Sequence, residues 1–179
     1  MLRNLLSRFR RDRKGSSTVE FVLIFPGFLA ILFVAYESGM MMVRNVLLER
    51  GVELAVRELR LGTVPAPRYD NTKDLICEGA MLIDPADCDE ILQVQMEPVD
   101  QASWNILDLN SRCIDQTNTT NPLDETVFTE GGDDQLMLIR VCALYQPMFA
   151  PTGWGMRMPA DGDGNYALIV TAAFVNEPT

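Results

Sequence analysis

The hydrophobic residues of this chain change their spacing along its length. From Val19 to Val34 they are nearly continuous, with 12 Leu, Ile, Val or Phe side chains. The apolar residues that follow recur at helical spacing, which predicts one buried helix face: Leu48, Val52, Ala55, Val56 and Leu59. Gly62, Pro65 and Pro67 come next and predict the end of a helix. One helix from about Ser17 to Leu61 is therefore expected, apolar all round in its first half and one-sided in its second.

Beyond the prolines the pattern becomes short and strand-like. Asp74 to Met81 predicts a short helix, and Leu92 to Glu97 alternates apolar and polar residues as a half-exposed strand does. Leu136 to Tyr145 is apolar except for Arg140 and predicts a buried strand, and Tyr166 to Val175 predicts the last strand. We expect an α+β protein in which the long helix packs on an antiparallel sheet of three or four strands.

Two segments are less regular. Residues 98–112 fit either a helix or a loop with buried apolar side chains, and residues 115–134 form a polar connection. The expected organisation has four parts: a basic leader (1–15), a transmembrane helix (16–43), its amphipathic continuation (44–62) and a soluble α+β domain outside the cytoplasm (63–179).

The apolar run is long enough to cross a bilayer. Val19 to Met42 would span about 36 Å as a helix, against a hydrocarbon thickness of about 30 Å. Its apolar side chains favour insertion by roughly 5 kcal/mol, while Glu37 costs at most about 3 kcal/mol. The run is longer than the core of a cleavable secretory signal, so an anchor is the better interpretation. Six bases within residues 1–14 favour a cytoplasmic N-terminus.

Charge and composition exclude several functions. The net charge is −10, and beyond residue 15 the chain holds nine bases against 24 acids. Such an acidic body does not bind nucleic acid through its phosphates. The chain has no histidine, which removes the most frequent general base and metal ligand. No nucleophile, phosphate-binding or dinucleotide-binding motif is present, so we predict neither an enzyme nor a cofactor.

Four cysteines lie beyond the apolar run. An even number there predicts two disulfides in an oxidising compartment, although four reduced core cysteines are an alternative. Three pairings are possible, and proximity in the sequence favours Cys77–Cys88 and Cys113–Cys142.

One short segment is similar to the start of a calcium-binding loop. It carries Asp161, Asp163 and Asn165, but Tyr166 replaces the required glycine and Ala172 replaces the bidentate glutamate. Turn chemistry explains these residues better, and no metal site is predicted, although calcium stays open.

The start of the apolar run carries a further pattern. In Lys14-Gly-Ser-Ser-Thr-Val-Glu-Phe21, Gly15 follows a basic leader and Glu20 is the fifth residue after it. This arrangement resembles the processing signal of type IV prepilins. With Pro26 behind it, the segment is similar to the opening of TadE-like proteins, which are minor pilins, or pseudopilins, of the Flp/Tad (tight adherence) pilus.

The resemblance implies a processed, pilin-like subunit. A prepilin peptidase would cut after Gly15 and leave Ser16 as the new N-terminus. Glu20 would face the cationic N-terminus of a neighbouring subunit, and Pro26 would be either a passive kink or a weak point used in packing. The implied partners are the major pilin, a second minor pilin, the peptidase and the inner-membrane assembly platform, with the C-terminal domain periplasmic or extracellular.

Electrostatics supports the role of Glu20 independently of the resemblance. A carboxylate in hydrocarbon must be protonated or paired, and an ammonium is a strong partner in a medium of low dielectric constant. The alternatives are an ordinary signal anchor, in which Gly15 and Glu20 are incidental, and a membrane-anchored binding module that is not incorporated into a pilus.

Overall fold

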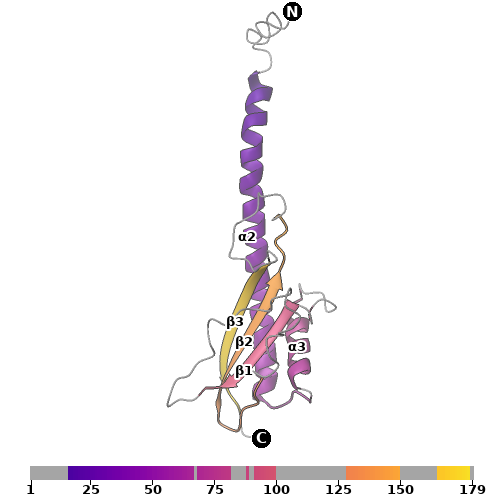
Figure 1. Ribbon diagram of the computed structural model, residues 1–179, viewed down its shortest axis with the longest axis vertical. Helices are drawn as coiled ribbons and strands as arrows, with labels where there is room; N and C mark the ends of the chain where they lie inside the picture. Colours follow the sequence, from indigo (N-terminus) through magenta and orange to yellow (C-terminus); the bar gives the residue numbers. More distant parts are fainter. Residues whose placement is uncertain are drawn as a thin grey trace, which may run out of the picture.

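A computed structural model describes residues 16–66, 68–81, 88, 91–99, 128–149 and 165–177. The elements run in the order α2 (Ser16–Arg60), α3 (Arg68–Gly79), β1 (Leu92–Pro98), β2 (Leu136–Tyr145) and β3 (Tyr166–Val175). Figure 1 shows the three strands lying across the C-terminal half of α2, with α3 beside them and the N-terminal half of α2 standing clear. The predicted α+β class, a long N-terminal helix with a small antiparallel sheet, is confirmed.

The sheet has the order β1-β2-β3, and both strand pairs are antiparallel. Val94, Val141 and Val170 lie opposite one another in this register. Because side chains alternate between the two faces of a strand, every second residue points toward the helices. These residues form the core on the sheet side: Leu92, Val94, Met96, Met137, Ile139, Val141, Ala143, Tyr145, Tyr166, Leu168, Val170 and Phe174.

The C-terminal half of α2 supplies the other side of the core. Leu48, Val52 and Ala55 are at most 1% exposed, and Leu59 is 9% exposed. The predicted amphipathic face is therefore confirmed. Burying a Leu or Val side chain favours folding by about 1.5–3 kcal/mol, so this face fixes which side of the helix the sheet covers.

Two glycines set the separation of α2 and α3. A Cβ atom added to Gly51 would lie 2.4 Å from the carbonyl oxygen of Ile76, and one added to Gly79 would lie 2.5 Å from the Cα of Gly51. At both positions, backbone atoms of the opposite helix occupy the space that a Cβ would need. The two helices can approach this closely only because both residues are glycine.

The connection between the helices accounts for one confirmed and one wrong prediction. Helix α2 ends at Arg60, and Gly62 follows with a φ of 66°, as the predicted stop requires. Helix α3, however, begins at Arg68 and not at Asp74. Its buried face includes the polar residues Thr72 and Lys73. The first turns of α3 therefore lack the helical spacing of apolar residues by which a buried helix face is predicted.

The segment after β3 is held next to this turn. The backbone N–H of Glu177 donates to the carbonyl oxygen of Arg60 at 3.1 Å, and their side chains form an ion pair of 3.1 Å. The end of β3 is thereby tied to the end of α2. Residues 100–127 lie outside the described residues, so the alternatives for 98–112 stay open beyond Val99.

The close approach at Gly51 gives a direct test of the helix packing. We expect Gly51→Ala to lower the free energy of unfolding by about 1–3 kcal/mol, because the added methyl meets backbone atoms. Gly39→Ala is the matched control, since no atom lies within 4 Å of its added Cβ and alanine favours a helix by up to about 1 kcal/mol. Denaturant unfolding in detergent, followed by circular dichroism and limited proteolysis, compares the two. Equal stabilities would contradict the packing described here.

Candidate functional site

The N-terminal half of α2 is an apolar surface that the domain leaves uncovered (Figure 1). Every described side chain from Ser17 to Phe28 is exposed, and Leu23, Ile24 and Ile31 are 70–74% exposed. Among the described helices, α2 alone has the length and apolar composition needed to cross a membrane. An apolar surface of this size marks a membrane or protein contact in a folded chain.

The predicted processing and assembly residues lie at the start of this surface. Gly15 is outside the described residues, and Ser16 is the first residue of α2. Glu20 is exposed in the second turn, and Pro26 lies inside the helix, which continues to Arg60. The geometry therefore brings Ser16, Glu20 and Pro26 onto one uninterrupted helix.

A buried carboxylate lies where the described part of the domain meets the apolar half of α2. Glu37 is 2% exposed, and the backbone N–H of Phe149 lies 3.4 Å from its Oε1 atom and donates to it. The Phe149 ring stacks on Phe33 at 4.7 Å between centroids and meets Tyr36 edge-on at 6.1 Å. The segment after β2 thus lies along the helix and covers Glu37 with backbone and aromatic side chains.

A second contact lies two turns further along α2. The Nη1 atom of Arg44 donates to the hydroxyl of Tyr166 at 2.7 Å, and the Arg44 guanidinium lies 4.8 Å from the centroid of the Tyr145 ring. Tyr145 and Tyr166 are cross-strand partners, and their rings lie 6.0 Å apart. A guanidinium between two tyrosines is attracted to both the ring face and the hydroxyl, so this trio fixes the sheet against the helix.

The surroundings of this trio also shift the pKa of the Tyr145 hydroxyl. Burial raises the pKa of Tyr145 to about 12, and nearby Tyr166 contributes to the rise, while Arg44 acts in the opposite direction. Desolvation dominates because it disfavours the charged phenolate.

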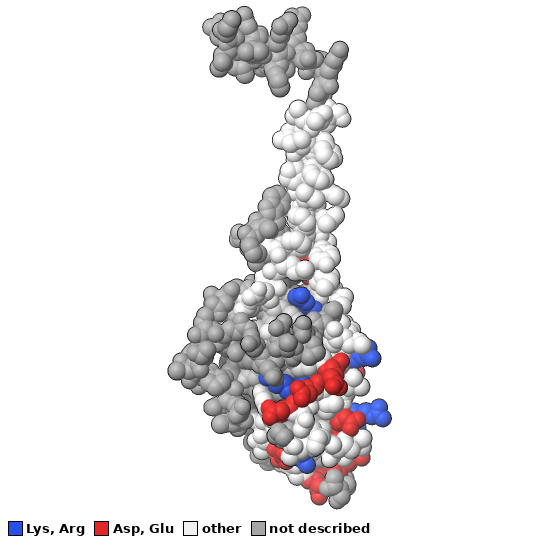
Figure 2. Space-filling view, turned by 90° about the vertical axis from the view of Figure 1, so that its right-hand side faces the viewer, with Lys and Arg blue, Asp and Glu red and all other residues white. Residues whose placement is uncertain are grey.

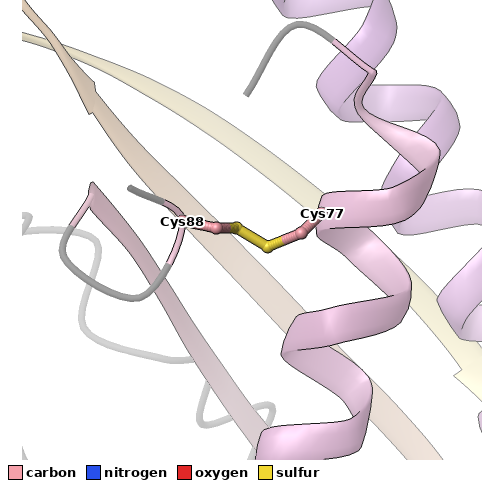
Figure 3. Close-up of a disulfide and its surroundings, with 2 residues drawn as sticks. All are labelled: Cys77 and Cys88. Carbon is pink, nitrogen blue, oxygen red and sulfur yellow. A yellow bond between two sulfur atoms is a disulfide. The ribbon is translucent and has the colours of Figure 1, made fainter. Parts of the chain in front are cut away.

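The cysteines tie α3 to the sheet. Cys77 and Cys88 form a disulfide with 6.3 Å between their Cα atoms, joining α3 to the segment before β1, as Figure 3 shows. This is the pairing that proximity in the sequence favours. Cys142 is also disulfide-bonded, and its predicted partner, Cys113, lies outside the described residues. Closing the short loop between Cys77 and Cys88 favours folding by about 2–4 kcal/mol.

The possible calcium segment falls largely outside the described residues. Asp161 and Asp163 are not among them, while Asn165 is described and 3% exposed. Within the described ranges, no group of three His, Cys, Asp or Glu side chains is arranged to hold a metal ion.

The sequence did not reveal the contacts at Glu37 and Arg44. The sequence predicts only a cost to insertion at Glu37, and it predicts no contact for Arg44. Their partners are 112 and 122 residues away, so no local pattern could link them. The one available signal was a carboxylate next to aromatic residues at the end of the apolar run.

Comparison with known proteins identifies the N-terminal segment. A family model described as TadE-like protein matches residues 15–57. No curated protein and no solved structure matches the chain. The matched range covers the uncovered half of α2 and most of its packed half. The predicted resemblance to TadE-like proteins of the Tad pilus system is confirmed over this segment.

Titration of Tyr145 tests the packing of the helix against the sheet. A phenol whose pKa is raised on folding favours the folded state below its unfolded pKa of about 10, and this contribution is lost as the pH rises through about 12. We expect Tyr145→Phe to remove the last phase of tyrosinate absorbance and to weaken the fall in stability between pH about 10 and about 12. An unchanged alkaline profile in the variant would contradict the assignment.

Proposed function

We propose that this chain, TadE-like over residues 15–57, is a minor pilin, or pseudopilin, that takes part in assembling a Tad-type pilus. The observation that carries the proposal is the coincidence of the family match with the uncovered apolar half of α2. The family match indicates involvement in the Tad pilus system, and the geometry supports a subunit that acts through its N-terminal helix.

The proposed membrane position follows from the contact of Phe149 with α2 around Glu37. Residues 17–36 precede Glu37 and would rise about 30 Å as a helix, which matches the hydrocarbon thickness. Phe33, Tyr36 and Phe149 would then lie at the membrane–water boundary, where aromatic side chains are enriched. We place the end of the membrane segment near Tyr36, a little before the boundary at 43 that hydropathy alone favours.

The orientation places the domain outside the cytoplasm. The basic leader favours a cytoplasmic N-terminus, and the Cys77–Cys88 disulfide fits an oxidising compartment. The chain would cross the inner membrane once and carry its domain on the periplasmic side.

Processing would occur at the boundary between leader and helix. A prepilin peptidase is proposed to cut after Gly15, so that the new N-terminus is Ser16, where α2 begins. Cleavage there would place an ammonium group four residues before Glu20 on the same helix. An ammonium and a carboxylate attract each other strongly near the hydrocarbon of a membrane, because the dielectric constant there is low. If two helices pack with a shift along their axes, the ammonium of one helix can pair with the Glu20 carboxylate of its neighbour.

The partners would be other subunits with similar helices. The exposed side chains of Leu23, Ile24 and Ile31 offer an apolar surface to a neighbour, and the helix continues through Pro26 within this surface. We propose the major pilin and a second minor pilin as neighbours, the prepilin peptidase as processing enzyme and the inner-membrane assembly platform as the site of action.

Two substitutions separate cleavage from assembly. We expect replacement of Gly15 by a bulky residue to leave the leader attached. Glu20→Ala should permit cleavage and yield Ser16 as first residue, yet reduce recovery of the chain with assembled pili, because the ammonium loses its partner. N-terminal sequencing and fractionation of sheared pili measure the two effects.

Thr18→Ala is the matched control for Glu20→Ala, since Thr18 is also exposed on the first turns of α2. It should be cleaved and recovered as the unmodified chain is. An intact Met1, or normal recovery of the Glu20 variant, would overturn the corresponding part of the proposal.

A further inference from the structure

The hairpin formed by α2 and α3 carries a groove that none of the roles above uses. The groove has a volume of about 530 Å³ and lies between the two helices on the membrane-distal part of the molecule. Apolar side chains line much of it, including Leu54, Leu75 and Val64. Leu54 is 43% exposed and Met81 at the rim is 72% exposed, so apolar surface remains in contact with water here.

Charges of opposite sign border the groove on its two helices. Arg50 and Arg57 line it from α2 and are exposed. Glu58 lines it from α2 as well, where its carboxylate accepts a hydrogen bond from the Thr63 hydroxyl. On α3, Glu78 lines the groove. Asp74 and Asp70 are exposed four and eight residues before it, so the three carboxylates form one stripe that runs along α3 from the groove. Figure 2, which faces this side, shows an acidic band with basic groups beside it.

Arg50, Arg57, Asp74 and Glu78 form no ion pair within the described part of the molecule. Its ion pairs are Arg60–Glu177 and Arg68–Glu130, and neither includes a charged residue of the groove. The two arginines are also notable because the chain beyond residue 15 has only nine bases against 24 acids. A basic row beside an acidic stripe in so acidic a body favours a partner with the reverse arrangement.

The positions of these charges along the helix axes, measured from the Gly51–Gly79 contact, indicate which partner fits. The Gly51–Gly79 contact fixes the register of the hairpin. From that contact, a rise of about 1.5 Å per residue places Arg57 and Asp74 within about 1.5 Å of the same level. By the same count, Arg50 and Glu78 differ in height by only about 3 Å.

Equal heights are what a two-fold axis along the membrane normal requires. Two copies anchored in the same membrane by parallel helices are related by such an axis, and it keeps every residue at its own level. Rotation by 180° then sets the arginine row of one copy opposite the acidic stripe of the other, and the reverse contact forms by symmetry. The exposed apolar residues of the groove lie between the two sets of pairs.

We propose that the α2–α3 groove is a self-association surface, in which Arg50 and Arg57 of one copy pair with Glu78 and Asp74 of a second copy. Leu54 and Met81 are covered at the centre of this contact. The interface is formed by the domain and is independent of cleavage at Gly15 and of the contacts proposed for Glu20.

A charge exchange between two co-expressed, differently tagged full-length chains tests the contact. One variant carries Arg50→Glu and Arg57→Glu, and the other carries Asp74→Arg and Glu78→Arg. Each variant alone sets like charges opposite one another, so self-association measured by co-purification from detergent should fall on the order of tenfold. Co-expression of the two variants restores opposite charges at every contact and should restore co-purification.

The matched control places the same charge change elsewhere on the surface. Glu49→Arg with Asp133→Arg adds as many positive charges as the α3 variant, on exposed residues that do not line the groove. The control variant should co-purify as the unmodified chain does. High salt should weaken co-purification slightly for every pair that associates, because salt screens the exposed charges. The Cys77–Cys88 disulfide, mapped under non-reducing conditions, reports that each variant is folded.

Four outcomes would overturn the proposal, and the first three concern the tagged chains themselves. The unmodified tagged chains could fail to co-purify, the two groove variants could associate as well as the control, or the mixed pair could stay apart although both members fold. Capture of a different membrane protein in place of the second copy would also contradict it. The inference rests on the proposed membrane anchoring of α2. Because the readout is self-association in detergent, failure here leaves the proposed role in pilus assembly unaffected.

Discussion

The structure depends on one constraint: a single helix must be stable in two different surroundings. The first half of α2 is apolar all round and uncovered, while the second half buries one face under a sheet and a second helix. Apart from the one hydrogen bond that Pro26 cannot donate, a continuous helix satisfies its interior backbone groups in either medium. It therefore transmits the position of the membrane segment directly to the domain, without a flexible linker between them.

The contacts around the middle of α2 make that transmission rigid. Glu37 is covered by the backbone and ring of Phe149, and Arg44 is held between Tyr145 and Tyr166. Both sites join the helix to residues at the membrane-proximal end of the sheet. The domain consequently has a fixed height and rotation on the helix, which an assembly subunit needs if its helix register is to determine where its domain lies.

Much of this arrangement follows from the sequence because it rests on local periodicity. The buried face from Leu48 to Leu59, the end of α2 and the three strands could all be predicted from the spacing of apolar residues. The start of α3 could not, since Thr72 and Lys73 are buried on its inner face. The TadE-like segment was recognisable because its motif is local, whereas the surroundings of Glu37 and Arg44 depend on residues more than 100 positions away.

The proposed contact between the uncovered half of α2 and other pilin-like subunits can be tested directly in cells. The most direct measurement is photo-crosslinking in living cells that carry the pilus machinery, with a photoreactive amino acid in place of Leu23, which is 74% exposed. A probe in place of Ile169, 48% exposed on β3, reports on the domain surface. The account predicts that the Leu23 probe forms adducts with another pilus subunit through its apolar N-terminal segment, in higher yield than the Ile169 probe. Adducts with lipid alone at position 23, from a stable and processed chain, would contradict it.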